Sequence, residues 1–477
     1  MAVWMILAVY FVAMAGIGVY GYRRSSSFTD FVVGSRKAGP WVSAFAYGTN
    51  YFSAVLFIGY AARSGWDFGL WAMLIGVGNA FFGTYLAWKL LAEKTREFTR
   101  REKIKTMPQL FEKRYGSPAM KIYCAIVLFI FMTPYSASVY SGLSYLCEMV
   151  LGLEYHFAML AVAVVSGVYL VLGGYVASLS ADFVQGIIMI FGVIAMVLCI
   201  GNAPDVGGFV NGLTAIAQRE MLASPLSLIC LVLLTSFGAW GMPQMLHKFF
   251  GIADGDAIKK GRTISTVFCA IISIGAYYVG SMSGMFFDSI PAGGSDVMIP
   301  QILVRTLPPV LLGVVLVLVL SASVSTLSGI TLTSCSTFAV DLVGSVRSIT
   351  KKQSLTLTRW LCVLFIAGSF LIASFRSPIL TLMSFSWGAV AGSFLPPYLL
   401  GLYFKWMNRF GAWCGMVGGL AIELVLAAIS GFSAGAAPVI GICAIAGSFA
   451  LCICGSLVYN AVNKQVEDNT DVLAERT

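Results

Sequence analysis

Long apolar segments, nearly free of charged residues, limit this chain to very few architectures. Only 11% of its 477 residues are charged, whereas soluble domains carry about 25%. Lipid offers no water to open backbone groups, so segments that cross a bilayer must be helices or a closed barrel. The unbroken apolar run at residues 311–322 lacks the alternation of barrel strands. We therefore predict an all-α membrane protein.

Division of the apolar pattern at turns and charge clusters predicts about thirteen membrane-spanning helices of roughly 20 residues or more. They are expected at residues 2–21, 41–63, 69–92, 120–151, 156–174, 180–201, 224–247, 262–287, 301–343, 356–374, 378–404, 409–430 and 435–460. The first segment has no basic residues before it and is followed by Arg23 and Arg24. This order indicates a retained span rather than a cleaved signal peptide.

The net charge of +9 comes from lysines and arginines that lie in short clusters between apolar segments. These clusters are at residues 23–37, 89–121, 248–262, 347–359 and 405–409. Basic residues concentrate in cytoplasmic loops of membrane proteins. We therefore expect a multi-pass protein of the cell (inner or plasma) membrane, with the N-terminus outside and the C-terminus cytoplasmic. Only Arg63, Arg219, Arg305 and Arg376 then lie near the outer face, and a nucleic-acid partner is not expected.

Motifs of enzymes and metal sites do not account for the polar residues of this chain. The eleven cysteines lie mostly inside apolar segments, and the two histidines, His156 and His247, are far apart in the sequence. Cysteines in such segments are typical of small core residues rather than of a disulfide or metal framework. No HExxH motif occurs, and we expect no enzyme activity.

Turn-forming and polar residues interrupt two of the apolar segments in mid-span. They are Gly48, Thr49, Asn50 and Ser53 in the first segment, and Gly238, Gly241, Pro243 and Gln244 in the second. Each interrupted segment begins a block of five expected helices. Broken helices at matching positions of two halves indicate an inverted-repeat transporter with a site near the membrane midplane. Ordinary kinks at glycine and proline are the alternative interpretation.

This interpretation divides the chain into six parts. They are an N-terminal extra helix and loop (1–40), a first inverted repeat (41–201), an outer loop (202–223), a second inverted repeat (224–405), two peripheral helices (406–460) and a cytoplasmic tail (461–477). The tail is polar and is expected to be disordered.

Hydroxyl side chains are most concentrated in the expected helix at 301–343. They are Ser321, Ser323, Ser325, Thr326, Ser328, Thr331, Thr333, Ser334, Ser336 and Thr337. Such hydroxyls can bond to a carbonyl one turn earlier or join neighbouring helices. With carbonyls freed by a broken helix, they can also bind sodium, a hard cation that takes several oxygen ligands. Adjacent Ser325 and Thr326 are the candidates to face the interruption at residues 49–52.

Two carboxylates stand inside or at the edge of apolar segments. Asp182 begins an apolar helix near the inner membrane face, where a charge is costly and usually has a partner; stabilisation by the helix dipole is the alternative. Glu423 lies deeper in its segment but outside the two repeats, and we interpret it as a contact between helices.

Four passages of the sequence resemble the sodium/solute symporter family. They are Gly39-Pro40 before the first interruption, residues 173–177 followed by Asp182 and Gln185-Gly186, residues 324–328, and Trp387 followed by Gly392. The resemblance extends over nearly the whole chain. It implies the five-plus-five inverted-repeat core of LeuT-like secondary transporters.

The resemblance also implies where sodium binds. In this family the common site uses two carbonyls of core helix 1 and oxygens of core helix 8. The matching groups are the carbonyls of Thr49, Phe52 and Ala322 and the hydroxyls of Ser325 and Thr326. Some members hold a second cation, for which Asp182, Ser325 and Ser328 are the candidates; the family's second serine is replaced by Gly329.

The expected solute cavity is aromatic and amidic and contains no fixed cation. Its candidate residues are Tyr47, Asn50, Tyr51, Tyr135, Trp240 and Gln244. The proline-transporting branch has an aspartate at the position of Tyr51 and an aromatic pair at Thr235 and Ala239, although its helix 3 tyrosine matches Tyr135. The gating tyrosine of the sugar branch also aligns with Ala239. A small zwitterion, a polyol or an acid held by helix dipoles therefore all remain open.

Sodium-coupled symport of a small organic solute into the cell by alternating access is the function that these features favour. Its partners would be sodium, the solute and the lipid bilayer, with the oligomeric state left open. Proton-driven symport and a transporter-like membrane sensor are the alternatives. A passive channel is disfavoured because paired broken helices are typical of alternating access.

Overall fold

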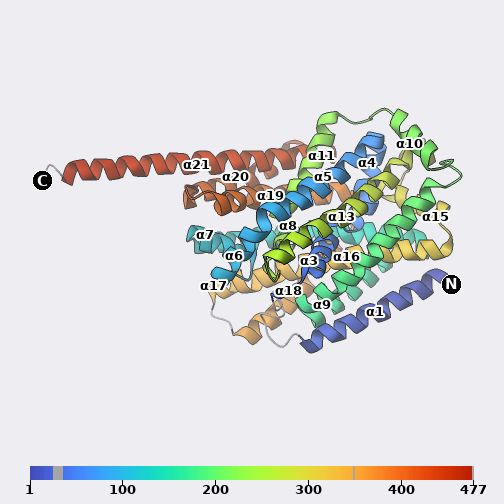
Figure 1. The fold of residues 1–477 in the computed structure, drawn as a ribbon, viewed down its shortest axis with the longest axis horizontal. Helices are drawn as coiled ribbons and strands as arrows, with labels where there is room; N and C mark the ends of the chain where they lie inside the picture. The colour runs from blue at the N-terminus through green and yellow to red at the C-terminus, as the bar shows by residue number, and fades with distance from the viewer. Residues whose placement is uncertain (25–35, 348–349, 475–477) are drawn as a thin grey trace.

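Helices make up every named element of the fold, which we describe from a computed structural model (Figure 1). The structure describes residues 1–24, 36–347 and 350–474. Most of the expected basic cluster at 23–37 lies outside the described residues. No strand occurs in the described part of the chain, as expected for an all-α membrane protein.

Long apolar helices are slightly fewer than we predicted. Among the described residues, ten helices are long and apolar enough to cross a membrane, or eleven if one bent pair is counted as a span. The prediction of about thirteen is therefore too high. One cause is α9 (Tyr155–Gly201), which is continuous where we expected two helices, at 156–174 and 180–201. Its glycines and serines do not end the helix, because a break in lipid would leave backbone groups without partners.

Both predicted interruptions are present. Helix α3 (Pro40–Tyr51) stops at Phe52, whose extended backbone (φ −114°, ψ 139°) leads to the π-helical segment η1 (Val55–Tyr60) and to α4 (Ala61–Phe68). Helix α11 (Pro225–Phe237) and the 3-10 turn η5 (Gly238–Gly241) precede Met242, which is also extended. The chain bends by 50° there before α12 (Pro243–Phe250).

Further helices surround these two broken helices. They are α1 (Ala2–Arg24), α5 (Met73–Gly78), the π-helical segments η3 (Asn79–Leu86) and η4 (Trp88–Ala92), α6 (Glu93–Arg101), α7 (Met107–Tyr115), α8 (Pro118–Leu151), α10 (Phe209–Gln218), α13 (Gly255–Ser281), α15 (Met298–Thr306), α16 (Pro309–Thr337), α18 (Lys351–Ala373) and α19 (Ile379–Tyr403). Helix α16 packs against α8, α9 and α3, and α13 packs against α3, α4, α5 and α9.

Two glycines bring α4 and α13 into backbone contact. A Cβ on Gly280 would lie 1.9 Å from the carbonyl oxygen of Ala61, and one on Gly65 would lie 2.0 Å from the backbone of Gly280. Only glycine allows this approach. The contact fixes α4, which follows the break in the first interrupted helix, against α13.

The C-terminal helices α20 (Arg409–Ile429) and α21 (Ala437–Ala474) pack against each other and against α19. Helix α21 continues to Ala474 and projects from the bundle (Figure 1). The expectation of a disordered tail at 461–477 is therefore wrong up to Ala474. A helix that already ends a long apolar span extends more easily than it nucleates, because nucleation is the costly step.

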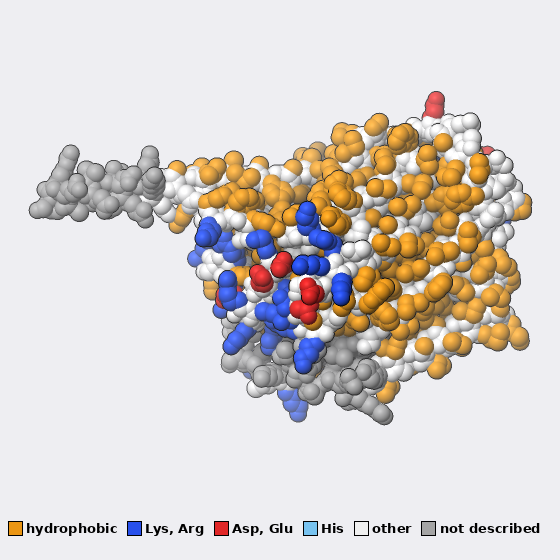
Figure 2. All heavy atoms as spheres, viewed as in Figure 1, with side chains coloured by type: hydrophobic (Ala, Val, Ile, Leu, Met, Phe, Trp, Pro, Cys, Tyr) orange, Lys and Arg blue, Asp and Glu red, His pale blue; other side chains and the backbone are white. Residues whose placement is uncertain are grey.

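Charged side chains gather at one end of the face that Figure 2 shows, whereas apolar side chains cover most of the remainder. Helices α6 and α7 lie at that end, and the N-terminus lies at the other end of the molecule (Figure 1). An apolar belt beside a charged end is the surface expected of a protein that crosses a bilayer.

Candidate functional site

The break in the first interrupted helix faces the hydroxyl-rich part of α16. Thr326 Oγ1 donates to the carbonyl oxygens of Phe52 (3.1 Å) and Thr49 (3.3 Å). These carbonyls are available because the helix stops at Tyr51 and leaves its last acceptors without amide partners. Ala322 lies one turn before Thr326 and is fully buried. The hydroxyl and both carbonyls that we selected from the sequence thus lie together.

Ser325 connects this break to a second polar group. Its hydroxyl lies 3.0 Å from Thr49 Oγ1 and 2.6 Å from Asp182 Oδ1, to which it donates. The amide nitrogen of Asn50 donates to Ser325 Oγ (2.9 Å) and lies 3.3 Å from Asp182 Oδ2. Ser328, the other candidate for a second cation, donates to the carbonyl of Ser325 on its own helix (2.8 Å).

Lys248 is the member of this cluster that sequence reasoning missed. Its ammonium nitrogen lies 2.8 Å from Asp182 Oδ2, and the side chains are only 3% and 1% exposed. The sequence pattern predicts a cytoplasmic basic cluster at 248–262, and for Lys248 this prediction is wrong because its side chain is buried. Lys248 lies in the last turn of α12, the second half of the second broken helix, which follows the 50° bend and contacts α3 and α16.

The six residues predicted to line a solute cavity do not lie in one place. Tyr47 donates to the Gly83 carbonyl (2.9 Å), and Trp240 Nε1 donates to the Phe82 carbonyl (3.1 Å), so both polar atoms join helices. Asn50 faces Asp182 and Ser325. Gln244 is buried, and neither polar atom of its amide has a hydrogen-bond partner in the described structure.

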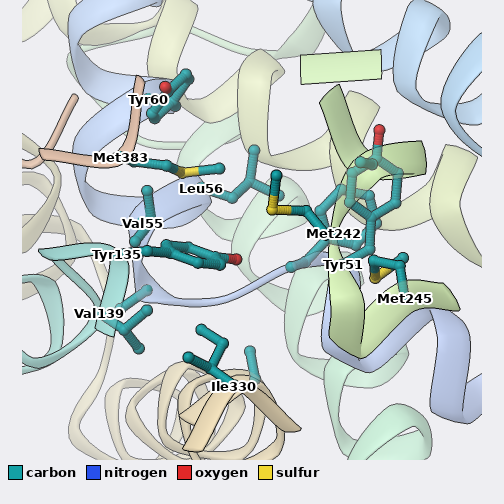
Figure 3. Packing of buried hydrophobic residues seen from close by; sticks show 14 of the residues in the cluster. Tyr51, Val55, Leu56, Tyr60, Tyr135, Val139, Met242, Met245, Ile330 and Met383 are labelled. Carbon is teal, nitrogen blue, oxygen red and sulfur yellow. The ribbon is translucent and has the colours of Figure 1, made fainter. Parts of the chain in front are cut away.

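The rings of Tyr51 and Tyr135 both lie near the ring of Trp387. The Tyr51 ring is stacked near Trp387 at 6.4 Å, and the Tyr135 ring meets it edge-on at 5.8 Å. Figure 3 shows the Tyr135 hydroxyl directed toward the side where Met242 and Tyr51 lie. The Tyr51 hydroxyl donates to the Thr235 carbonyl (2.7 Å). This aromatic group is therefore the part of the predicted cavity that the structure brings together.

A small cavity lies at this aromatic group, directly beside the break. It is lined by Tyr51, Phe52, Ser53, Val55, Leu56, Tyr60, Asn79, Thr235, Tyr277, Met383 and Trp387, and none of these side chains is charged. Its volume of about 20 Å³ admits about one water molecule. Sequence reasoning missed Asn79 and Tyr277 here, although Asn79 is a lone amide in an apolar run.

A larger cavity of about 300 Å³ lies one helical turn further along three of the same helices. Ser64, Leu231 and Leu380 line it, each one turn from Tyr60, Thr235 and Met383 of the smaller cavity. Four charged residues contribute to its wall, namely Arg63, Asp67, Asp296 and Arg376. Burial raises the pKa of Asp296 to about 6, although the backbone amide of Ile379 donates to its carboxylate (3.1 Å).

Arginines join the segments at the other end of the broken helices, away from the larger cavity. Arg100 donates to the carbonyls of Arg36 and Ile252 (2.8 Å each), and Arg96 also donates to the Ile252 carbonyl (3.1 Å). Arg36 donates to the carbonyl of Ile104 (2.6 Å). We call Arg36, Arg96 and Arg100 the arginine latch. It joins the residues before α3, the segment between α6 and α7, and the residues after α12.

Glu423 on α20 lies against the core. A Cβ on Gly388 of α19 would meet its carboxylate at 2.4 Å, which confirms the predicted contact between a peripheral and a core helix. Neither carboxylate oxygen has a hydrogen-bond partner in the described structure.

A bundle of membrane helices with two mid-span breaks, one facing buried hydroxyls, defines a secondary transporter. The sequence from 31 to 419 matches the model of the Sodium:solute symporter family, and the chain belongs to that family. It is 28% identical over 440 residues to the sodium/proline symporters of Staphylococcus aureus strains JH9 and JH1, covering 88% of this chain and 85% of each relative.

Solved structures show the same fold. A Na⁺-coupled sialic acid symporter, in a substrate-bound outward-open state, superposes with a TM-score of 0.78 at 18% identity, covering 96% of this chain and 98% of that one. A manganese transporter of Eremococcus coleocola gives a TM-score of 0.53 at 11% identity, covering 88% and 94%. The chain is thus a LeuT-like, sodium-coupled solute symporter and not an enzyme.

Proposed function

We propose that the coupling sodium binds between the carbonyls of Thr49, Phe52 and Ala322 and the hydroxyls of Ser325 and Thr326. The contact of Thr326 Oγ1 with the Phe52 and Thr49 carbonyls carries this proposal. It brings three neutral oxygens from two helices within reach of one point. A hard cation at that point would be ligated by oxygen alone, and the Thr326 proton would turn away from the carbonyls.

The solute enters the cell in this proposal, driven by sodium. A membrane potential of about 100 mV contributes roughly 2.3 kcal/mol per charge, and a tenfold sodium gradient adds about 1.4 kcal/mol. One sodium ion per solute then sustains accumulation on the order of several hundredfold.

The N-terminus lies outside and the C-terminus inside in this proposal, in the cell membrane. The charged end of the molecule at α6 and α7 supports this orientation, because basic residues concentrate on the cytoplasmic side. The N-terminus is at the other end, and α21 projects at the charged end. The repeats are then residues 41–201 and 224–405, each beginning with a broken helix.

Alternating access would use the two cavities and the arginine latch. The larger cavity is bordered by α4, which lies at the end away from α6 and α7, and we propose that it is the outer vestibule. Side chains such as Tyr60 and Met383 separate it from the smaller cavity by about one helical turn. The latch closes the cytoplasmic side. In this proposal the structure is an outward-facing state in which the smaller cavity has contracted.

The solute is a small molecule that is neutral overall or zwitterionic. Support comes from the smaller cavity, whose lining has aromatic and amide side chains but no charge. Of the named relatives, the sodium/proline symporters carry a zwitterion, which agrees with this proposal, whereas the sialic acid symporter carries an anion. Tyr51 donates to the Thr235 carbonyl and narrows this cavity, so the solute must displace or contact it.

A thermal-shift screen of the purified full chain tests the function. Amino acids, sugars and organic acids would each be added in sodium buffer and in potassium buffer. We expect one solute class to raise the melting temperature only when sodium is present, because coupled binding stabilises the same folded state. Equal shifts in both cations would contradict sodium coupling at this site.

A further inference from the structure

The buried ion pair of Asp182 and Lys248 lies within hydrogen-bond distance of the proposed sodium site. Asp182 is on α9 and Lys248 is on α12, and their charged atoms are 2.8 Å apart. Asp182 also accepts hydrogen bonds from Ser325 and Asn50. Each of its oxygens is therefore already bonded to a donor, and the negative charge is balanced by an ammonium inside the protein.

The residues proposed for a second cation do not fit one in this arrangement. A sodium ion at Asp182 needs further oxygen ligands, but the nearest charged partner of the carboxylate is the Lys248 ammonium. Ser328 directs its proton to the carbonyl of Ser325 on its own helix. Two cations close to one carboxylate would repel each other in a region from which water is excluded.

The side chain of Asn50 fills the space next to Gly329, where glycine has no side chain. A Cβ on Gly329 would lie 2.1 Å from Asn50 Oδ1. A serine at position 329 would therefore collide with the Asn50 amide, whose nitrogen donates to Asp182 and Ser325. The chain thus has the amide oxygen of Asn50 where a ligating hydroxyl would otherwise stand, and the amide nitrogen of the same side chain is directed to Asp182 and Ser325.

We propose that Lys248 supplies the positive charge that a second sodium would bring to Asp182, so that this symporter binds one sodium ion only. The inference rests on the proposed sodium site at Ser325 and Thr326. In this arrangement Asp182 accepts the Ser325 proton, which leaves a lone pair of Ser325 directed away from the carboxylate for the single sodium. Lys248 is a positioning residue, since it acts through Asp182 and Ser325.

Equilibrium binding of radioactive sodium to the purified full chain tests the inference without any knowledge of the solute. We expect one sodium per chain and a Hill coefficient of about 1 in the unmodified protein. In Lys248→Gln the carboxylate of Asp182 loses its counter-ion, so we expect a second sodium to bind and the stoichiometry to rise toward two per chain. Lys248→Arg keeps the charge and should remain at one sodium.

Two further variants keep the test decisive if Lys248→Gln folds poorly. The double variant Asp182→Asn with Lys248→Gln removes both charges and should bind one sodium, more weakly because Ser325 loses its carboxylate acceptor. Lys121→Gln breaks the more exposed pair with Glu112 (2.9 Å) and should leave the stoichiometry at one.

The outcomes separate this inference from the proposed function. Two sodium ions per unmodified chain would overturn the role of Lys248 and leave sodium coupling intact. A well-folded Lys248→Gln protein that still binds one sodium would overturn it as well. No sodium binding in the unmodified chain would overturn both proposals together.

Discussion

Thr326 on α16 places its hydroxyl oxygen 3.1 Å from the carbonyl oxygen of Phe52, the residue at which the first broken helix stops. The two residues are far apart in the sequence, and their contact joins the core of α16 to the unwound segment. A conformational change that moves α3 against α16 must therefore alter this contact. Sodium binding and helix movement are coupled at this point in our account.

Thr49→Ala should change sodium affinity much less than Ser325→Ala does. The proposed ligand from Thr49 is its carbonyl, which survives the substitution, whereas Ser325 loses the ligating oxygen. Loss of a buried polar contact costs about 1–3 kcal/mol, which is roughly five- to 150-fold in affinity. Sodium titrations of both purified variants measure this difference. Equal losses in the two variants would argue that the hydroxyls only join helices.

Arg100→Ala should loosen the end of the molecule that the arginine latch joins. This arginine donates to two carbonyls on different segments, and hydrogen bonds from charged groups contribute about 1.5–3 kcal/mol each. Amide exchange of Ala38 and Ala253, which take part in backbone hydrogen bonds across this contact, should therefore accelerate at least about tenfold. Hydrogen-exchange mass spectrometry measures it.

Arg101→Ala is the matched control for this change, because Arg101 is largely exposed and its contacts with Glu102 and the Phe98 ring stay within its own part of the chain. It should leave exchange at Ala38 and Ala253 unchanged. If both variants accelerated exchange equally, the effect would reflect general loss of charge and not the arginine latch.

The stability of the protein should rise as the pH falls from 7 toward 4, in part because of Asp296. Burial raises its pKa from 3.8 to about 6, so the folded state takes up a proton at a higher pH than the unfolded chain. One pKa unit corresponds to about 1.36 kcal/mol, which sets an upper bound of about 3 kcal/mol for this contribution. Melting temperatures between these pH values measure it.

Asp296→Asn should remove this part of the pH dependence, whereas Asp205→Asn, at a partly exposed pair with Arg305, should retain it. An unchanged slope in Asp296→Asn would show that another group causes the pH dependence.

Gly280→Ala should destabilise the contact of α4 with α13. The added methyl group would meet the Ala61 carbonyl at 1.9 Å, and overpacking of this kind costs about 1–3 kcal/mol. The apparent melting temperature should fall measurably. Gly16→Ala on α1, where no atom lies within 4 Å of the added Cβ, is the control and should have little effect. A similar melting temperature in both variants would contradict the close approach.

Apolar pattern and turn residues were sufficient to predict the helical class and both broken helices. Glycine, proline and polar residues in mid-span carry a direct structural meaning, because lipid penalises open backbone groups. The contact of Thr326 with residues 49 and 52 also followed from the sequence, since hydroxyls and free carbonyls are complementary and the family resemblance aligned them.

The partner of Asp182 could not be predicted in the same way. Lys248 stands beside His247 and shortly before Lys259 and Lys260, so sequence neighbours suggested a solvated basic cluster. Only the 50° bend before α12 turns its side chain toward Asp182. Two residues predicted for the solute cavity, Tyr47 and Trp240, use their polar atoms to join helices, and the sequence does not reveal these partners either.

The sodium dependence of thermal stability in Thr326→Ala is the most direct test of the sodium site. The full purified chain would be titrated with sodium at constant ionic strength, with potassium as the replacement cation. We predict that the half-saturating sodium concentration rises roughly five- to 150-fold in Thr326→Ala. It should stay unchanged in Thr333→Ala, whose hydroxyl bonds only to carbonyls of its own helix in the described structure. An unaltered half-saturating concentration in a folded Thr326→Ala protein would contradict the placement of the ion between α3 and α16.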